Sequence, residues 1–209
     1  MPPSLFRHAR FETSIAKPAA LPPGEGAEIA FAGRSNAGKS SAINTLAGHT
    51  RLAYVSKTPG RTQLLNFFRL PNGACVVDLP GYGYAAAPEK IRHSWQALIE
   101  HYLKTRENLI GLVLMMDARH PLTPLDQQMI DWFAPSGRPI HVLLTKSDKL
   151  SRGPAQACLL KVRSALKAYA PQVSAQLFSS LAKTGIEECE RVVAGWLDLD
   201  FQTRNSSCP

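Results

Sequence analysis

The chain has 209 residues, of which 44% are hydrophobic, and its 24 lysine and arginine residues outnumber 16 aspartate and glutamate residues, which gives a net charge of +8 at pH 7. This length and apolar content suit a single core, no stretch reaches the ~20 apolar residues of a membrane span, and the N-terminal segment lacks the apolar centre of a secretory signal, so we expect a cytoplasmic protein. The four cysteines are far apart and form no C-x-x-C pair, which argues against a zinc site and against a disulfide framework.

Residues 1–27 are rich in proline and weakly patterned, which predicts an N-terminal arm. Within this arm residues 11–15 can form a short strand, and the alternative is an arm that packs without pairing. The rest of the pattern predicts one domain over residues 28–199 and a flexible tail over residues 200–209.

A phosphate-binding loop is the most informative feature of the chain. Residues 28–32 form an apolar run suited to a buried strand, residues 41–46 predict the first turns of a helix, and the sequence between them has the form G-x-x-x-x-G-K-[ST]. The two glycines let backbone N–H groups point inward, the lysine reaches the outer phosphates, and the final serine can hold a magnesium ion at the helix N-terminus. The loop residues are Gly33, Arg34, Ser35, Asn36, Ala37, Gly38, Lys39 and Ser40.

A long loop and a hairpin follow the first helix. Residues 49–62 carry polar, glycine and proline residues without apolar periodicity, and compact domains usually keep such loops for function, so we expect this loop to be mobile without ligand. Residues 64–70 and 74–78 are strand-like runs joined by an Asn-Gly turn, which predicts an antiparallel pair.

From residue 88 onward helix-like and strand-like segments alternate. Continuous apolar runs predict strands over residues 109–116, 140–144 and 173–178. Apolar residues at helical spacing and helix-start signals predict helices over residues 88–105, 123–133, 158–169 and 184–197. This order predicts an α/β domain of the P-loop type, with a doubly wound, mostly parallel sheet that has one antiparallel edge strand.

A second motif of the form D-x-x-G lies at the end of the strand predicted over residues 74–78. Its aspartate would orient magnesium, through water, and its glycine can place a backbone N–H near the γ-phosphate, where a larger residue would block close approach. Loops at the carboxyl ends of parallel strands are where this fold binds ligands. The motif residues are Asp78, Leu79, Pro80 and Gly81.

A third motif, T-K-S-D, follows the strand over residues 140–144 and indicates the base. Asp148 can accept two hydrogen bonds from guanine, whereas adenine has no N1 proton and no 2-amino group to donate. The stem of Lys146 can cover the purine face. The structural alternatives are a helix cap for Asp148 and a solvated charge for Lys146. The expected base-binding residues are Thr145, Lys146, Ser147 and Asp148, with Phe178, Ser179 and Ser180 after the last strand.

These motifs, together with the segments over residues 56–63 and 77–85, resemble the EngB (YihA/YsxC-type) family of bacterial translation-factor-class GTPases over nearly the whole chain from residue 11 to residue 197. The resemblance implies a small GTPase that acts in large ribosomal subunit assembly and that is needed for normal cell division and septation. It further implies that Thr62 is the second protein ligand to magnesium beside Ser40, and that the loop closes on the γ-phosphate of GTP and relaxes after hydrolysis.

The family pattern also assigns residues to binding and catalysis. In the long loop it adds Gly60, Arg61, Thr62, Gln63 and Leu64 to the nucleotide site. For catalysis it indicates Lys39, Thr62 and Gly81.

Three positions bear on the mechanism. Tyr82 stands where many GTPases have the glutamine that orients the attacking water, so we expect slow intrinsic hydrolysis without a side-chain general base. Thr145 stands where asparagine is commoner, which predicts a weaker strap to the phosphate loop. Asn36 is shared with GTPases that bind potassium beside the phosphates, and the alternative is that Asn36 only hydrogen-bonds the loop.

The partners expected are GTP or GDP, the large ribosomal subunit and its RNA, for a protein that acts as a monomer. Positive charge attracts polyanions by counterion release, although it can also serve only solubility. Arg51, Lys57, Arg61 and Arg69 around the long loop favour RNA. The alternative is a division-associated protein whose nucleotide state regulates a protein partner. A small-molecule kinase is disfavoured by the guanine motif.

Overall fold

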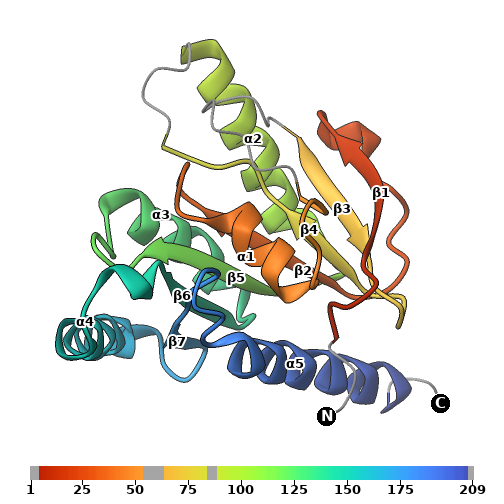
Figure 1. Ribbon diagram of the computed structural model, residues 1–209. Helices are drawn as coiled ribbons and strands as arrows, with labels where there is room; N and C mark the ends of the chain where they lie inside the picture. Colours follow the sequence, from red (N-terminus) through yellow and green to blue (C-terminus); the bar gives the residue numbers. More distant parts are fainter. Residues whose placement is uncertain (1–4, 54–63, 84–88, 207–209) are drawn as a thin grey trace.

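The computed structural model describes the backbone of residues 5–53, 64–83 and 89–206, and the side chains of these ranges except residues 89–95 and 199–206. A seven-stranded sheet in the order β1-β3-β4-β2-β5-β6-β7 forms the centre, with helices on both faces (Figure 1). The strands are β1 (Arg10–Ile15), β2 (Glu28–Gly33), β3 (Leu65–Arg69), β4 (Cys75–Asp78), β5 (Leu109–Asp117), β6 (Ile140–Thr145) and β7 (Val173–Leu177). The longer helices are α1 (Lys39–Leu46), α2 (Glu89–Thr105), α3 (Pro124–Phe133), α4 (Arg152–Ala165) and α5 (Ile186–Ser206).

The mostly parallel α/β sheet predicted from the sequence is confirmed. Strands β4, β2, β5, β6 and β7 run parallel, and β3 is the strand that runs against them. The edge beyond β3 is covered, however, because β1 from the N-terminal arm pairs antiparallel with β3. Residues 10–15 therefore pair as a strand rather than pack as a loose arm. This added strand satisfies backbone groups that β3 would otherwise leave unpaired at the sheet edge.

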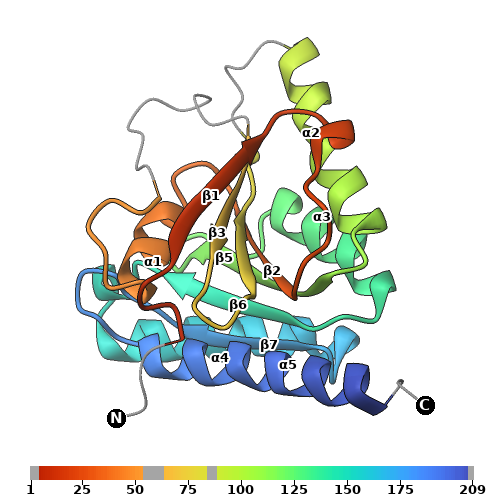
Figure 2. The ribbon, with the colours of Figure 1, turned by 90° about the vertical axis from the view of Figure 1, so that its right-hand side faces the viewer.

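Two apolar layers enclose the sheet. Helices α2, α3 and α4 pack on one face, and α1 and α5 on the other, as Figures 1 and 2 show. The central strands β2 and β6 are buried along their whole length, which explains why their sequences are continuous apolar runs rather than alternating ones.

The C-terminal helix is longer than expected. Helix α5 continues to Ser206, through most of the segment over residues 200–209 that we expected to be a flexible tail. That segment contains no glycine, and its only proline is Pro209, so nothing in it interrupts a helix before Ser206. No helix in the described part of the chain is both long and apolar enough to cross a membrane.

Candidate nucleotide-binding site

The phosphate loop lies between β2 and α1 and depends on its glycines. Gly38 precedes the first residue of α1 with a φ of +87°, in the left-handed region that a side chain rarely adopts. Gly33 is packed against β5, because a Cβ at this position would lie 2.9 Å from the carbonyl oxygen of Met115. The loop therefore presents the positive N-terminal end of α1 at the carboxyl edge of the sheet.

Lys39 and Asp78 form a buried ion pair at this edge. The Lys39 Nζ atom contacts the Asp78 Oδ1 atom, and the two residues are 9% and 3% exposed. Asp78 ends β4, which lies directly beside β2 in the sheet. Two motifs that are about forty residues apart in the chain are thus joined through their charged side chains.

The D-x-x-G segment continues along the phosphate loop. The Ser35 N–H donates to the carbonyl oxygen of Tyr82 at 2.8 Å, and the Tyr82 N–H donates to that of Gly33 at 3.3 Å. A Cβ at Gly81 would lie 3.3 Å from the Ser35 Cα atom, tighter than nine in ten real contacts of that kind. The backbone of the phosphate loop therefore leaves little room for a side chain at this position, whose N–H is expected at the γ-phosphate.

The Tyr82 side chain points into the core. Its hydroxyl donates to Asp126 Oδ1 at 3.0 Å, and the residue is 8% exposed. Burial, followed by the negative charge of Asp126, raises the pKa of Tyr82 well above its ordinary value. Tyr82 is therefore a local packing residue, neutral at physiological pH, and it offers no base to a water molecule.

Thr145 links the base motif to the phosphate loop. Its hydroxyl lies 2.6 Å from the carbonyl oxygen of Ala37 and 3.1 Å from that of Met116. The first distance is that of a strong hydrogen bond. The shorter threonine side chain therefore reaches the loop, and the geometry gives no sign of the weakened strap expected from the sequence.

Lys146 is held in place rather than solvated. Its Nζ atom donates to the carbonyl oxygen of Asn36 at 2.6 Å and pairs with Asp117 Oδ2 at 3.0 Å. Asp117 also accepts from the Arg119 guanidinium at 2.6 and 2.9 Å. Burial opposes the charge of Asp117, but the bonds from Arg119 and Lys146 outweigh it and lower the pKa of this carboxyl group. Asp117 and Arg119 were missed from the sequence, although an aspartate that ends a buried strand was a usable signal.

Asp148 meets the loop that follows β7. The Ser179 hydroxyl donates to Asp148 Oδ1 at 2.5 Å, and this bond is the main cause that lowers the pKa of Asp148. The N–H and the hydroxyl of Ser147 both donate to the carbonyl oxygen of Phe178, at 3.2 and 3.0 Å. The helix-cap alternative for Asp148 is not what the structure shows, because Ser151 is the residue that precedes α4. Ser180 follows in the same loop.

Of the two expected magnesium ligands, Ser40 lies in the first turn of α1 and Thr62 lies outside the described residues. A serine hydroxyl is a hard oxygen ligand of the kind that magnesium accepts beside phosphates, whereas the Asp78 carboxylate, expected to act through water, is paired with Lys39. The described residues contain no group of three or more His, Cys, Asp or Glu that could hold a metal by itself. Of the long-loop residues, Gly60, Arg61, Thr62 and Gln63 lie outside the described part, and Leu64 is half-buried beside β3.

The basic residues expected around the long loop differ in their availability. Arg69 is engaged, because its guanidinium pairs with Glu12 at 2.6 Å and donates to the carbonyl oxygens of Glu25 and Gly73. It therefore stabilises the β1–β3 edge and is not a free contact for RNA. Arg51 is exposed, whereas Lys57 and Arg61 lie outside the described residues.

Comparison with protein families agrees with this geometry. A family model described as 50S ribosome-binding GTPase matches residues 28–146, which is more than half of the chain. Among solved structures, a GTP-binding protein named engB covers 82% of this chain and 99% of that one, with a TM-score of 0.68 and 22% identity, a likeness of fold. Era from Aquifex aeolicus, solved with GDP and AlF4−, covers 82% of this chain and 57% of that one, with a TM-score of 0.64 and 25% identity.

Sequence relatives are closer. A protein of Azoarcus sp. (strain BH72) is 80% identical over 194 residues, which span 92% of this chain and 93% of the relative. A protein of Neisseria meningitidis serogroup B is 57% identical over 197 residues, 93% of this chain and 94% of the relative. Both carry the name "Probable GTP-binding protein EngB". The chain therefore belongs to the EngB family of GTP-binding proteins, within the GTPases.

Proposed function

We propose that this GTPase is a switch that binds guanine nucleotides through the three segments described above and acts in the assembly of the large ribosomal subunit. The observation that supports it most is the meeting of the phosphate loop, the D-x-x-G segment and the T-K-S-D segment at one edge of the sheet. These segments are linked by the Lys39–Asp78 pair and by the Thr145–Ala37 hydrogen bond.

Guanine selection rests on Asp148. Its carboxylate is ionised and is oriented by Ser179, so it can accept from the N1–H and the 2-amino group of guanine. Lys146, fixed between Asn36 and Asp117, places its methylene stem beside the base. Adenine would leave the carboxylate without donors.

Hydrolysis relies on positioned charge. Lys39 neutralises charge on the outer phosphates, and loop N–H groups, including that of Gly81, stabilise the γ-phosphate in the transition state. Magnesium, held by Ser40 and by Thr62, would neutralise further phosphate charge. Because Tyr82 is bonded to Asp126 in the core, no described side chain takes the place of the water-orienting glutamine, and intrinsic turnover is slow.

Potassium is a second candidate for charge neutralisation. Asn36 is exposed in the phosphate loop with a φ of +64°, and its carbonyl oxygen accepts from Lys146, whereas no described residue forms a hydrogen bond with its side chain. If a potassium ion assists, turnover in potassium exceeds turnover in sodium, and Asn36→Ala abolishes that difference. Equal turnover in the two salts, with and without ribosomes, would rule potassium out.

A ribosomal partner is supported by the family description and by the charge of α4. Helix α4 and the adjoining 3-10 turn (Leu166–Tyr169) have no acidic residue of their own, and three of their exposed basic side chains are Arg152, Lys161 and Lys167. The fourth, Arg163, is engaged, because its guanidinium donates to the carbonyl oxygen of Ala175. The three other basic side chains suit phosphate contacts. The role in cell division and septation would then follow from the assembly of ribosomes.

The decisive test is co-sedimentation with purified large subunits, with a non-hydrolysable GTP analogue, with GDP and without nucleotide, at two salt concentrations. Retention that is selective for the GTP analogue at moderate salt supports the switch. The double variant Lys161→Glu/Lys167→Glu should reduce retention more than Lys17→Glu/Lys104→Glu, which changes the net charge equally elsewhere. Weak retention in every nucleotide state that modest salt removes would reject the ribosome and favour a division protein as partner.

A further inference from the structure

A buried amide lies behind the loop that carries Ser179. Gln176, on β7, is 1% exposed, and its Nε2 atom donates to the carbonyl oxygens of Gly185 at 2.6 Å and Leu177 at 3.2 Å. Two carbonyl acceptors fix which end of the amide carries the nitrogen. Gln176 therefore holds the chain at the point where the loop after β7 returns to α5.

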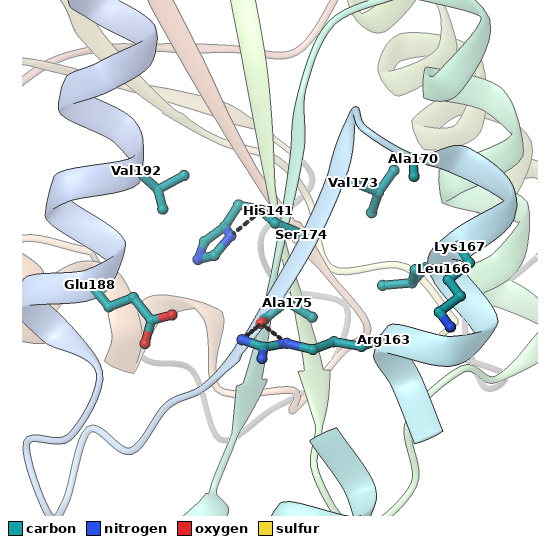
Figure 3. Close-up of a pocket in the computed structure, with 10 residues that line it drawn as sticks. All are labelled: His141, Arg163, Leu166, Lys167, Ala170, Val173, Ser174, Ala175, Glu188 and Val192. Carbon is teal, nitrogen blue, oxygen red and sulfur yellow. Dashed lines mark hydrogen bonds between the residues drawn. The ribbon is translucent and has the colours of Figure 1, made fainter. Parts of the chain in front are cut away.

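His141 sets the orientation of this amide. Its Nε2 atom lies 2.7 Å from Gln176 Oε1. Its Nδ1 atom lies 2.7 Å from the Ser174 hydroxyl, the contact that is dashed in Figure 3. Because the amide oxygen only accepts, the proton of the neutral imidazole is on Nε2, and Nδ1 accepts from Ser174. His141 lines a pocket of about 270 Å³. Arg163 on α4 and Glu188 on α5 line the same pocket, as Figure 3 shows.

The loop itself is closed between Ser179 and Thr184. The N–H of each residue donates to the carbonyl oxygen of the other at 3.1 Å, and the Ala182 N–H donates to the Ser179 hydroxyl oxygen at 3.0 Å. Gly185 comes next, with a φ of +78°, and a Cβ there would lie 2.3 Å from the Leu177 carbonyl oxygen and 2.6 Å from Gln176 Nε2. The position of Gly185, at the end of this loop, thus depends on Gln176, and the close packing leaves Gly185 little space to shift.

We propose that Gln176, oriented by His141, is a positioning residue for guanine recognition. Gln176 fixes the position of Gly185, which follows Thr184. The two hydrogen bonds between Thr184 and Ser179 then fix the position of Ser179, and the Ser179 hydroxyl orients the Asp148 carboxylate toward the base. This inference rests on the proposed contact between Asp148 and guanine. It assigns a role in base selectivity to a residue that does not contact the nucleotide.

The test measures base selectivity rather than activity. Inosine diphosphate lacks the 2-amino group of guanine, so the ratio of GDP to IDP affinity reports how well Asp148 is aimed. Gln176→Met keeps the length of the side chain and removes the amide, and it should lower this ratio about tenfold, the value of one hydrogen bond. Gln127→Met is the matched control and should leave the ratio unchanged. It removes a half-buried glutamine of α3 that is bonded to Asp131 on the same helix and to Tyr169 in the turn after α4.

A double variant tests the route. If Gln176 acts through Ser179, then Gln176→Met/Ser179→Ala has the same ratio as Ser179→Ala alone. Additive losses, or a Gln176→Met protein that unfolds more easily but keeps the ratio of the unmodified protein, would overturn the proposal. If Gln176→Met does not fold, Gln176→Asn replaces it, because asparagine keeps a buried amide but is too short to reach Gly185. The ratio of GDP to IDP affinity should then fall in Gln176→Asn, and an unchanged ratio would overturn the proposal.

Asp148→Asn separates this inference from the proposed function. A change of preference from GDP to xanthosine diphosphate supports Asp148 as the guanine contact. If GDP affinity does not change, the guanine assignment itself is wrong. If Asp148→Asn changes the preference while both Gln176 variants keep the ratio, only the positioning role is wrong.

Discussion

The phosphate end and the base end of this site are held by different interactions. At the phosphate end two opposite charges, Lys39 and Asp78, are buried against each other, so each charge depends on the other for compensation. At the base end the charges are partly exposed. The Asp148 carboxylate accepts from the Ser179 hydroxyl and lies 3.6 Å from the Lys149 ammonium, and Lys146 pairs with Asp117 at 3.0 Å. Lys39 must leave Asp78 when it binds the phosphates of the nucleotide, whereas the Asp148 carboxylate is already oriented to accept from the base. Removing one charge of the Lys39–Asp78 pair should therefore lower stability and turnover. Removing a hydrogen bond at the base end should lower base selectivity.

The largest effect is expected at the phosphate end. Lys39→Met should destabilise the protein by about 3 kcal/mol, because Asp78 remains as an uncompensated buried charge, and it should lower turnover about 100-fold, because a charge on the outer phosphates is lost. Urea unfolding and single-turnover hydrolysis measure the two effects. Lys39→Met/Asp78→Asn should regain most of the stability but none of the turnover. If the double variant is no more stable than the single one, the pair is not what holds this end.

At the base end, Asp148→Asn should weaken GDP binding about 100-fold, since two hydrogen bonds to guanine are lost. Stability without nucleotide should change little, because Asp148 lies in a surface turn (Ser147–Lys149). Nucleotide titration and urea unfolding of the same samples give both quantities. A large loss of stability would show that the base end, too, is held by a buried charge, and the contrast between the ends would disappear.

The connection between the two ends is Thr145, and a smaller effect is expected there. Thr145→Val leaves the Ala37 carbonyl oxygen without its donor, which should cost about 1 kcal/mol and speed nucleotide dissociation several-fold. Thr145→Ser keeps the hydroxyl and is the matched control. Stopped-flow dissociation of a fluorescent GDP derivative measures the rate, and equal rates in the two variants would mean that the strap has no part in retention.

The smallest effect is a dependence of stability on pH through His141. Burial lowers the pKa of His141 below its ordinary value of 6.5, with Gln176 on β7 and Glu188 on α5 raising it and Arg163 on α4 lowering it. The unfolded chain therefore binds the proton more readily, so this contribution to stability is complete above pH 6.5 and is lost as the pH falls toward the folded-state value. Urea unfolding between pH 7.5 and 5.5 checks this.

His141→Asn should flatten that profile, since the carboxyl groups with lowered pKa values, Glu12, Asp117 and Asp148, titrate below this range. A profile of unchanged slope in the variant would assign the dependence to other groups.

Local patterns in the chain predicted the elements well. Each of the strands expected from residue 28 onward is present within one or two residues, because the central strands are buried on both faces and need continuous apolar sequence. The strand from the arm was left open between two alternatives, since residues 11–15 alternate weakly and Ile15 is the residue of β1 that is buried. Its pairing depends on β3, which lies about fifty residues further along the chain.

The sequence by itself determined the phosphate loop, the D-x-x-G segment and the base motif, because each places its chemistry within a few consecutive residues and needs only one strand end to present it. Only the tertiary structure decided that Tyr82 is directed to Asp126, that Lys146 is held by Asp117, and that Gln176 supports the Ser179 loop. These contacts join residues from different elements and from the loops between them. The sequence carries no periodicity for them, because they exist only once the sheet has aligned the ends of its strands.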